Sequence, residues 1–280
     1  MSFEGEIITS PQNKYVSLVR GLSSRKRREK DMLFRFDGVK LMCEAIKKGV
    51  KISFALVDEA SWQSVLEKAE MLYGISESSI DFKIIPTAEK VFVGVSEESA
   101  PEGVICVAEY LSSVREIDEA SLLSAIPNEE KILLMESVRD PLNVGAIIRA
   151  SAAFGVDRVV ISDDCADVYN SKVIRASMGN LFGVQVDRVS DMQAAVAQLR
   201  SNGRRVFAAA LESDAHRLGE LEIKAGDCVI IGNEGHGLDK NTIEGCDGTV
   251  YIPMADGVES LNAATAAAVL SWEFFGVVRR

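Results

Sequence analysis

The stretch Asn143-Val144-Gly145-Ala146-Ile147-Ile148-Arg149 opens a helix directly after a strand that we predict at 131–135. Two further stretches also place small and polar residues where a strand should end. They are Ile231-Gly232-Asn233-Glu234-Gly235-His236-Gly237-Leu238, and Ile252-Pro253-Met254 with Ser260-Leu261-Asn262. Ligands bind at such strand ends in α/β domains, because backbone groups are exposed there and helix starts leave N–H donors unpaired. The three stretches together predict one composite binding site.

Strands and helices alternate around these stretches. We expect strands at 131–135, 158–162, 184–186, 205–211, 228–231 and 249–252, and helices at 143–154, 170–177, 190–201 and 260–275. This alternation predicts an α/β fold with a mostly parallel sheet covered on both faces.

The first part of the chain predicts a smaller α/β unit. Its helices are expected at 11–30, 39–46, 61–72 and 87–93, and its strands at 52–57, 82–85 and 103–108. An acidic, serine-rich segment follows and contains Pro127-Asn128, which is typical of a linker. We therefore expect an N-terminal domain over 1–110, a linker over 111–129 and a second domain over 130–280.

Composition is that of an ordinary soluble protein. Of the 280 residues, 47% are hydrophobic and 26% charged. No apolar run approaches the roughly 20 residues that span a bilayer, and the N-terminus has no secretory pattern. The five cysteines are scattered and form no C-x-x-C pair. We expect a cytoplasmic protein with no membrane segment, no disulfide and no metal site.

Charge is distributed unevenly along the chain. The net charge is −11, yet residues 1–51 carry twelve Lys or Arg against six Asp or Glu, so the remainder carries −17. The densest basic run is Arg25, Lys26, Arg27, Arg28 and Lys30, interrupted by Glu29. A protein that binds RNA needs a local basic footprint rather than a basic total. This run predicts an RNA-binding surface, and a solvated helix face is the alternative.

Residues 130–275 resemble the catalytic domain of the SpoU/TrmH RNA ribose 2′-O-methyltransferases, within the SPOUT superfamily. Three motifs carry the resemblance in order: Asn143-x-Gly145-x-x-x-Arg149, Gly232-Asn233-Glu234-Gly235, and Ile252-Pro253-Met254 through Ser260-Leu261-Asn262. The block Lys172–Gly179 is also similar to the family. The N-terminal unit is more loosely similar to a ribosomal-protein-like substrate-binding domain, through Asp37-Gly38 and Glu44-Ala45.

The resemblance implies a trefoil knot, a homodimer, and S-adenosylmethionine bound on the knotted loops. It implies cofactor contacts at the backbone near Leu211 and at Gly232, Ile252 and Leu261. It implies catalytic positions at Asn143, Arg149, Glu234, Ser260 and Asn262. The implied substrate is structured RNA, with ribosomal RNA as the leading expectation and transfer RNA as the alternative.

Arg149 is the residue whose chemistry decides the mechanism. The family's usual assignment makes this arginine the general base, but a guanidinium is effectively always protonated in proteins. We expect Arg149 to orient the nucleotide through its phosphate and to stabilise negative charge on the 2′-oxygen. The proton would then pass to water or to a neighbouring polar group such as Ser260 or Asn262.

Other interpretations remain open for several of these residues. Asn143 could serve only as a helix cap, and Glu234 could pair structurally with an arginine. We assign no role to His216 or His236. Two rival functions are an RNA-binding or ribosome-assembly protein without turnover, and an unrelated nucleotide-binding α/β enzyme.

Overall fold

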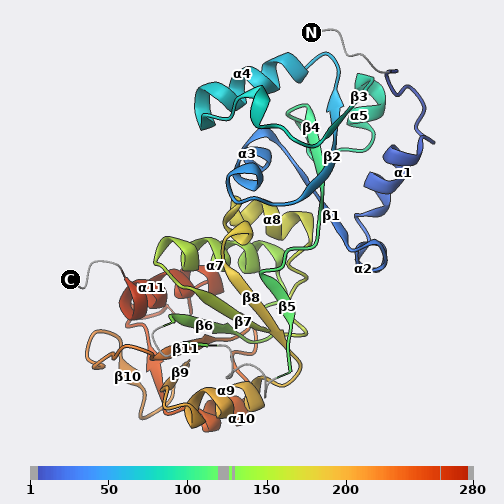
Figure 1. Cartoon of the computed structure of the whole chain (residues 1–280). Helices are drawn as coiled ribbons and strands as arrows, with labels where there is room; N and C mark the ends of the chain where they lie inside the picture. Colours follow the sequence, from blue (N-terminus) through green and yellow to red (C-terminus); the bar gives the residue numbers. More distant parts are fainter. Residues whose placement is uncertain (1–5, 119–125, 128–129, 259, 277–280) are drawn as a thin grey trace. The chain divides into compact units, whose positions relative to one another are not determined.

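The computed structural model describes residues 6–118, 126–127, 130–258 and 260–276 (Figure 1). Contacts divide the chain into two units. The first unit comprises Met1–Leu111 with Tyr169–Phe182, and the second comprises Ser112–Val168 with Gly183–Arg280. Among the described residues, no helix has the length and apolar character needed to cross a membrane.

The first unit has a four-stranded mixed sheet in the order β1-β4-β2-β3. β1 and β2 each run antiparallel to β4, and β3 runs parallel to β2. The strands are β1 (Leu33–Asp37), β2 (Ile52–Asp58), β3 (Lys83–Thr87) and β4 (Val104–Glu109). The helices are α1 (Lys14–Gly21), α2 (Arg25–Asp31), α3 (Val39–Lys47), α4 (Trp62–Tyr73), α5 (Glu89–Val93) and α8 (Ser171–Ser177), with short 3₁₀ turns η1 (Glu77–Ser79) and η2 (Asn180–Phe182).

The helix predicted over 11–30 is two helices in the structure. Asn13 begins α1, because its side chain accepts a hydrogen bond from the backbone N–H of Tyr15. α1 ends at Gly21 and the buried Leu22 follows it; the Arg28 guanidinium donates to the carbonyls of Leu22 and Ser23. These bonds stabilise the turn between the two helices. The helical prediction was wrong at this turn and at residues 11–13, which precede the first helix.

Strand β1 was missed from the sequence. Its central Arg35 is only 2% exposed and interrupts the apolar pattern between Phe34 and Phe36. The guanidinium is accommodated because it donates to the Asp37 carboxylate and to the carbonyl of Val95. From the sequence, Arg35 was expected to lie on the surface, and the strand around it was therefore not predicted.

Segment 169–182 joins the first unit, although it follows a strand of the second unit in sequence. The Phe182 ring lies 5.3 Å from that of Phe36. Arg175 pairs with Glu98 at 2.7 Å. Gly179 has φ +88°, and a Cβ there would lie 2.7 Å from the Cβ of Glu44. Glycine is therefore required at position 179 for both its backbone conformation and the close approach.

The same segment supplies a hydrogen bond to Glu97. Ser171 and Ser23 both donate to this carboxylate, and Arg35 lies 3.8 Å from it. Burial alone would raise the pKa of Glu97, but these hydrogen bonds and the charges of Arg35 and Arg175 outweigh it and lower the pKa below its ordinary value. The Glu97 carboxylate is thus stabilised in its charged form.

The second unit has an eight-stranded sheet in the order β10-β12-β9-β11-β6-β7-β8-β5, and every pairing is parallel. The strands are β5 (Val114–Glu116), β6 (Ile132–Met135), β7 (Arg158–Ser162), β8 (Gln185–Val189), β9 (Val206–Ala209), β10 (His216–Arg217), β11 (Cys228–Ile231) and β12 (Gly248–Tyr251). The helices are α7 (Pro141–Ala153), α9 (Met192–Ser201), α10 (Lys240–Gly245) and α11 (Ala263–Phe275).

Helices cover both faces of this sheet, as the alternation predicted. α9 and α10 lie on one face, and α7 and α11 lie together on the other (Figure 1). Met192, Val196 and Leu199 of α9 pack on Leu134 and Ile230 of the sheet in one apolar cluster. The predicted α/β fold with a mostly parallel sheet is confirmed, and the knot stays a prediction.

Buried charges hold the β7–β8–β5 side of the sheet. Asp187 is fully buried and accepts hydrogen bonds from Arg158 and from Arg115, the latter at 3.0 Å. Arg158 also donates to Glu130 at 2.8 Å. Each buried charge is therefore paired, as burial requires.

Three elements of the second unit were not predicted. β5 lies inside the segment 111–129 that we expected to be a linker, where its three residues pair with β8. That strand is too short to show a periodic pattern. Residues 119–125 and 128–129 of the expected linker lie outside the described residues. β10, with two residues, and α10, with six, were missed for the same reason, because each is too short to show a periodic pattern.

Candidate active site at the strand ends

The three sequence stretches occupy neighbouring strand ends of the second unit. β6 leads into the loop before α7, β11 leads into the loop 232–239, and β12 leads into the segment before α11. β6 pairs with β11, and α7 packs against α11. Because the strands are parallel, their carboxyl ends share one edge, which brings the three loops together.

A chain of hydrogen bonds joins one residue from each stretch. The Asn143 amide donates from Nδ2 to the Glu234 carboxylate. Asn262 donates from Nδ2 to Oδ1 of Asn143 at 2.9 Å. Asn143 is 8% exposed, whereas the other two residues are exposed. Asn143 therefore fixes the distance between a carboxylate on one loop and an amide on another.

Asn262 has a second function at the start of α11. Its Oδ1 accepts from the backbone N–H groups of Ala264 and Thr265, at 2.9 and 3.2 Å. This is a helix cap, and it fixes the orientation of the Nδ2 group that reaches Asn143. Asn143 itself is not the cap of α7, because Asp140 accepts from the Leu142 N–H in that role. The capping interpretation of Asn143 is therefore wrong.

The loop 232–239 folds back tightly on itself. Asn233 and Gly237 exchange two backbone hydrogen bonds, of 3.1 and 2.9 Å. A Cβ at Gly232 would lie 2.4 to 2.6 Å from backbone atoms of Gly237 and Leu238. No side chain fits at position 232 without opening this loop. The glycine is required by close backbone approach.

Buried polar groups anchor the loop to the neighbouring strand end. Asn233 donates to the carbonyl of Ser137 at 2.8 Å. Glu136, 7% exposed, accepts from the Asp239 N–H at 2.9 Å and from the Thr242 hydroxyl at 2.7 Å. The loop is thus fastened at both ends to residues that follow β6.

Ser137 has φ +56°, which is uncommon for a residue other than glycine. Its N–H donates to Ser162, and its hydroxyl donates to Asp164 at 2.7 Å. Partial burial would raise the pKa of Asp164, but hydrogen bonds from Ser162, Ser137 and Arg139 outweigh it and lower the pKa. These bonds hold Ser137 in its left-handed conformation.

Two adjoining cavities lie beside the hydrogen-bond chain. They measure about 450 and 590 Å³ and share a wall formed by 209–211, Ser260, Leu261 and Ala266. Gly232 and Glu234 line the larger cavity, and Ile252 and Met254 line the smaller one. All four residues expected to contact a cofactor, Leu211, Gly232, Ile252 and Leu261, therefore line this space. Volumes of this size are typical of small-molecule sites, at about 300–1,000 Å³.

Arg149 lies on the exposed face of α7. Six residues along an α-helix turn the side-chain direction by about 240°, so Arg149 points about 120° away from Asn143. It forms no hydrogen bond or ion pair with any other residue that the structure describes. The structure does not bring Arg149 into the Glu234–Asn143–Asn262 chain. Its guanidinium is available to an outside partner.

The expected RNA-binding residues lie on and around α2 of the first unit. Arg25 pairs with Glu29 at 2.6 Å, and Arg27 pairs with Asp31 at 2.5 Å. Lys26 and Lys30 are exposed. Arg28 is 4% exposed and bonds to backbone carbonyls. The prediction that Arg28 belongs to an RNA-binding surface is therefore wrong, because its guanidinium is buried against the turn between α1 and α2.

Sequence reasoning did not select Glu136 or Ser137 and gave Asn233 no role of its own. Asn233 lies inside the second stretch, so only its individual function was missed. Glu136 and Ser137 directly follow the buried strand β6, and a polar pair at that position is a signal that could have been used. Their function becomes visible only when the loop 232–239 is seen against them.

Comparison with family models agrees with this geometry. Residues 130–272 match the SpoU rRNA Methylase family, and residues 13–106 match the MRM3-like substrate binding domain. The first match covers half of the chain.

Two curated relatives are named rRNA methyltransferases. The chain is 32% identical over 270 residues to the 23S rRNA (guanosine(2553)-2′-O)-methyltransferase RlmP of Bacillus subtilis, covering 96% of this chain and 99% of the relative. It is 31% identical over 191 residues to the 23S rRNA (guanosine-2′-O-)-methyltransferase RlmB of Ralstonia nicotianae, covering 68% and 76%.

Solved structures share the fold over nearly the whole chain. An rRNA methyltransferase from Sinorhizobium meliloti matches with TM-score 0.78 and 25% identity, covering 96% of each chain. Its AdoMet-bound form also matches with TM-score 0.78, at 24% identity and the same coverage. The family match, the identity to RlmP and the convergence of the three stretches on one edge of the sheet lead to one conclusion: the chain belongs to the SpoU rRNA Methylase family.

Proposed function

We propose that this protein is an S-adenosylmethionine-dependent enzyme that methylates the ribose 2′-hydroxyl of a guanosine in 23S ribosomal RNA. The observation that carries the proposal is the Glu234–Asn143–Asn262 hydrogen-bond chain beside two adjoining cavities. The names of the Bacillus and Ralstonia relatives support the choice of guanosine and of 23S rRNA.

The cavities fit the cofactor in both size and lining. Ile252 and Leu261 offer flat apolar contact to an adenine ring, and the side-chain-free Gly232 lets backbone groups approach polar atoms closely. The backbone near Leu211 lies in the wall that both cavities share. When bound, the cofactor supplies a methyl group on a positively charged sulfur, which is already activated for transfer.

The residues of the site then have one main task, which is orientation. Holding reacting groups in line contributes several kcal/mol to catalysis, on the order of 7–11 kcal/mol in favourable cases. Asn143 and Asn262 set the position of the Glu234 carboxylate at the cavity wall. Ser260 lines both cavities and is exposed, so its hydroxyl can pass the 2′-hydroxyl proton to water.

We assign Arg149 to a phosphate next to the reacting ribose. Its exposure and its lack of a carboxylate partner among the described residues leave its charge available to RNA. A guanidinium binds phosphate through two parallel hydrogen bonds, which a lysine cannot reproduce. Arg149→Lys should lower kcat by about 100-fold while cofactor affinity stays unchanged. Near-normal turnover in that variant would contradict the role of the guanidinium shape.

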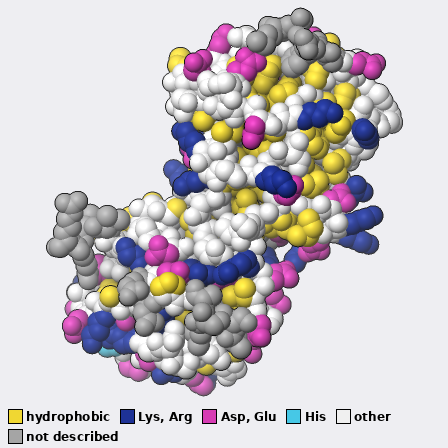
Figure 2. All heavy atoms as spheres, in the orientation of Figure 1, with side chains coloured by type: hydrophobic (Ala, Val, Ile, Leu, Met, Phe, Trp, Pro, Cys, Tyr) yellow, Lys and Arg dark blue, Asp and Glu magenta, His cyan; other side chains and the backbone are white. Residues whose placement is uncertain are grey.

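The first unit would bind the RNA through a basic edge. Lys and Arg side chains gather over α1 and α2 (Figure 2). We retain Lys26 and Lys30 as direct phosphate contacts, with Arg25 and Arg27 beside them in ion pairs. Lys26→Glu with Lys30→Glu should weaken RNA binding and reduce its salt dependence while cofactor binding is spared. The matched control is Lys47→Glu with Lys48→Glu, at the end of α3.

We further propose that the protein is a cytoplasmic homodimer. Leu142 on α7 and Trp272 on α11 are 55% and 50% exposed, and these two helices are packed together. The Trp272 ring contacts Phe154, the residue after α7, edge-on with ring centres 5.7 Å apart. Exposed apolar side chains at both ends of this helix pair offer a surface on which a second copy of the chain can pack. Light scattering should report a dimer, and Trp272→Arg should shift it towards monomer.

The decisive experiment maps ribose methylation by mass spectrometry in 23S rRNA from cells with and without the gene. One guanosine should lose its methyl group when the gene is absent and regain it with the wild-type gene but not with Arg149→Lys. Loss of a methyl group from transfer RNA instead would favour the alternative substrate. RNA binding without methyl transfer to any RNA would favour a non-catalytic assembly protein.

A further inference from the structure

A second polar cavity lies in the first unit, on the far edge of its sheet. It measures about 390 Å³ and is enclosed by the segment 6–10, the start of α1 and strand β3. The segment 6–10 runs beside β3, because Ile8 exchanges backbone hydrogen bonds of 3.0 Å with Pro86 and Ala88. The cavity is therefore built by backbone pairing, with α1 as its floor.

One end of this cavity is cationic and contains a phenol. Lys83 donates from Nζ to the Tyr15 hydroxyl at 3.0 Å. Lys14 and Lys83 each place Nζ 5.1 Å from the centre of the Tyr15 ring. Neither lysine has a carboxylate partner among the described residues. Lys83, which lines the cavity, thus keeps its charge available beside the Tyr15 hydroxyl, and Lys14 adds a second positive charge over the same ring.

The hydrogen-bond direction at Tyr15 matters for ligand binding. The phenol oxygen accepts from Lys83, so its own proton is left to donate to an incoming acceptor. This hydrogen bond lowers the pKa of Tyr15 below its ordinary value, and the charges of Lys83 and Lys14 add to the effect. A phenol with a lowered pKa is a stronger donor. The Lys83 ammonium and this phenol together form a pair of donors suited to a phosphate.

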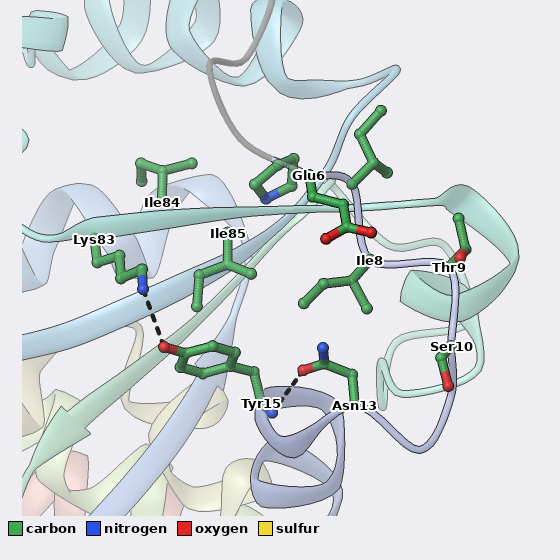
Figure 3. A pocket seen from close by; sticks show the side chains of 11 residues that line it. Glu6, Ile8, Thr9, Ser10, Asn13, Tyr15, Lys83, Ile84 and Ile85 are labelled. Carbon is green, nitrogen blue, oxygen red and sulfur yellow. Dashed lines mark hydrogen bonds between the residues drawn. The ribbon is translucent and has the colours of Figure 1, made fainter.

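The remainder of the cavity is apolar with a polar far side. Figure 3 shows Ile8 and Ile85 on either side of the space above Tyr15, with Glu6 opposite the phenol. The Asn13 side chain also lies at the floor, where its Oδ1 is already used to begin α1. Its Nδ2 group is left for a ligand. A carboxylate such as that of Glu6 can accept hydrogen bonds from the amino groups of cytosine, adenine or guanine.

We propose that this cavity binds one unpaired nucleotide of the RNA substrate, with its phosphate at Lys83 and Tyr15 and its base between Ile8 and Ile85. The inference rests on the proposed function, because it takes RNA as the substrate. Recognition of single-stranded RNA commonly combines a basic groove with apolar or aromatic contact to an unstacked base. The site lies apart from the α2 residues assigned above, so it adds a second point of attachment within the same unit.

The test measures binding of a fluorescein-labelled cytidine decamer to the full-length protein by anisotropy, over a range of salt concentrations. Lys83→Gln and Tyr15→Phe remove one donor each with little change of shape. The matched control is Lys48→Gln, an exposed lysine after α3 that lines no part of the cavity. Melting temperature and calorimetric titration with S-adenosylmethionine verify that each variant is folded.

We expect Lys83→Gln to weaken decamer binding about tenfold at low salt and to reduce the slope of log affinity against log salt by about 0.7. Tyr15→Phe should weaken binding by a smaller factor, and Lys48→Gln should leave it unchanged. Cross-linking with a decamer that carries one 4-thiouridine should label the peptide containing Tyr15. Such results would support the site even if no methyl transfer to RNA were found, so the two proposals fail separately.

Equal affinity of the wild type and Lys83→Gln would overturn the proposal, and so would the absence of decamer binding by the wild type. Equal loss in the Lys48→Gln control would also overturn it, because the effect would then report net charge alone. Cytidine monophosphate is the competing probe. If it displaced the decamer at equal concentration, the cavity would be a site for a small metabolite rather than for an RNA chain.

Discussion

Asn143→Asp is a substitution whose cost can be worked out from the geometry of the site. The aspartate keeps the Oδ1 atom that accepts from Asn262, so that hydrogen bond is retained. It replaces the Nδ2 donor by a second oxygen, which would face the Glu234 carboxylate. A favourable charge-assisted bond is thus exchanged for a repulsive contact at almost unchanged volume.

The magnitude follows from two contributions. A hydrogen bond to a charged acceptor contributes about 1.5–3 kcal/mol. Two like charges about 4 Å apart repel by about 1 kcal/mol in water-like surroundings and about 4 kcal/mol at an effective dielectric constant near 20. Because Glu234 is exposed, we take the lower part of that range, about 1 kcal/mol. Asn143→Asp should therefore lower the free energy of unfolding by about 3 kcal/mol at neutral pH.

Combining the substitution with Glu234→Gln isolates the contact. Alone, Glu234→Gln should cost about 1 kcal/mol, because a neutral acceptor replaces a charged one. Together, the amide at position 234 can donate to the carboxylate at position 143, so the pairing is restored with donor and acceptor exchanged. The double variant should recover about 2 kcal/mol relative to the sum of the single variants.

Urea unfolding of all four proteins at one protein concentration, followed by circular dichroism, measures this coupling. Agreement of the double variant with the sum of the single variants to within about 0.5 kcal/mol would refute the reasoning. Methyl transfer is not expected to return in the double variant, because the carboxylate would stand on helix α7 instead of on the loop 232–239. Stability and activity are therefore separate readouts.

Four further predictions test other parts of the structure. Gly232→Ala should weaken S-adenosylmethionine binding by at least about tenfold in calorimetry, because its Cβ would lie 2.4 Å from the Gly237 backbone and open the loop; unchanged affinity would place the cofactor elsewhere. All five thiols should react slowly with a disulfide reagent at pH 8 in the native protein and quickly after unfolding. The reason is that burial raises the pKa of Cys43 and Cys228 to about 11 and that of Cys246 to about 12, and also raises the pKa of Cys106 and Cys165. One thiol that reacts rapidly in the native protein would contradict this. Because the pKa of Glu97 is lowered in the folded protein, its carboxylate contributes stability at pH values above the ordinary glutamate pKa, near 4.3, and this contribution is lost as the pH falls through the lower pKa of the folded state. Ser171→Ala should therefore reduce the dependence of the unfolding free energy on acid pH. An unaltered pH profile would show that the Ser171 hydrogen bond does not contribute to this dependence. Asp187→Asn should lower the unfolding free energy by about 3 kcal/mol, because Arg158 would lose a buried charged partner, whereas the exposed control Asp163→Asn should have little effect; equal effects of the two variants would argue against a special role for the buried pair.

The sequence predicted the sheet of the second unit well, because β6 and β11 are continuous apolar runs and β7 has three apolar residues at its centre, a pattern typical of parallel strands buried on both faces. The sequence predicted the structure poorly where a charged side chain is buried among apolar residues. Arg35 hid β1, and Arg28 looked like a surface cation although it is buried. In both cases the partners are backbone carbonyls or a neighbouring carboxylate, and composition alone does not show such partners.

For the site, the sequence selected residues that the structure brings together, but it did not show how they are connected. Spacing alone does not reveal that Asn143 donates to one loop and accepts from another. The position of Arg149 was the weakest point. The motif places it one and a half turns beyond Asn143, and only the helix geometry shows that the two side chains diverge.

The connection between β7 and β8 of the second unit contains helix α8, which belongs to the first unit. Phe34 and Phe36 of the first unit are covered by Tyr169 and Phe182, which arrive more than a hundred residues later in synthesis. A ribosome that has released only the first 111 residues therefore presents two uncovered aromatic rings. A stop codon or a cut between the halves would separate Phe34 and Phe36 from the two later rings that contact them.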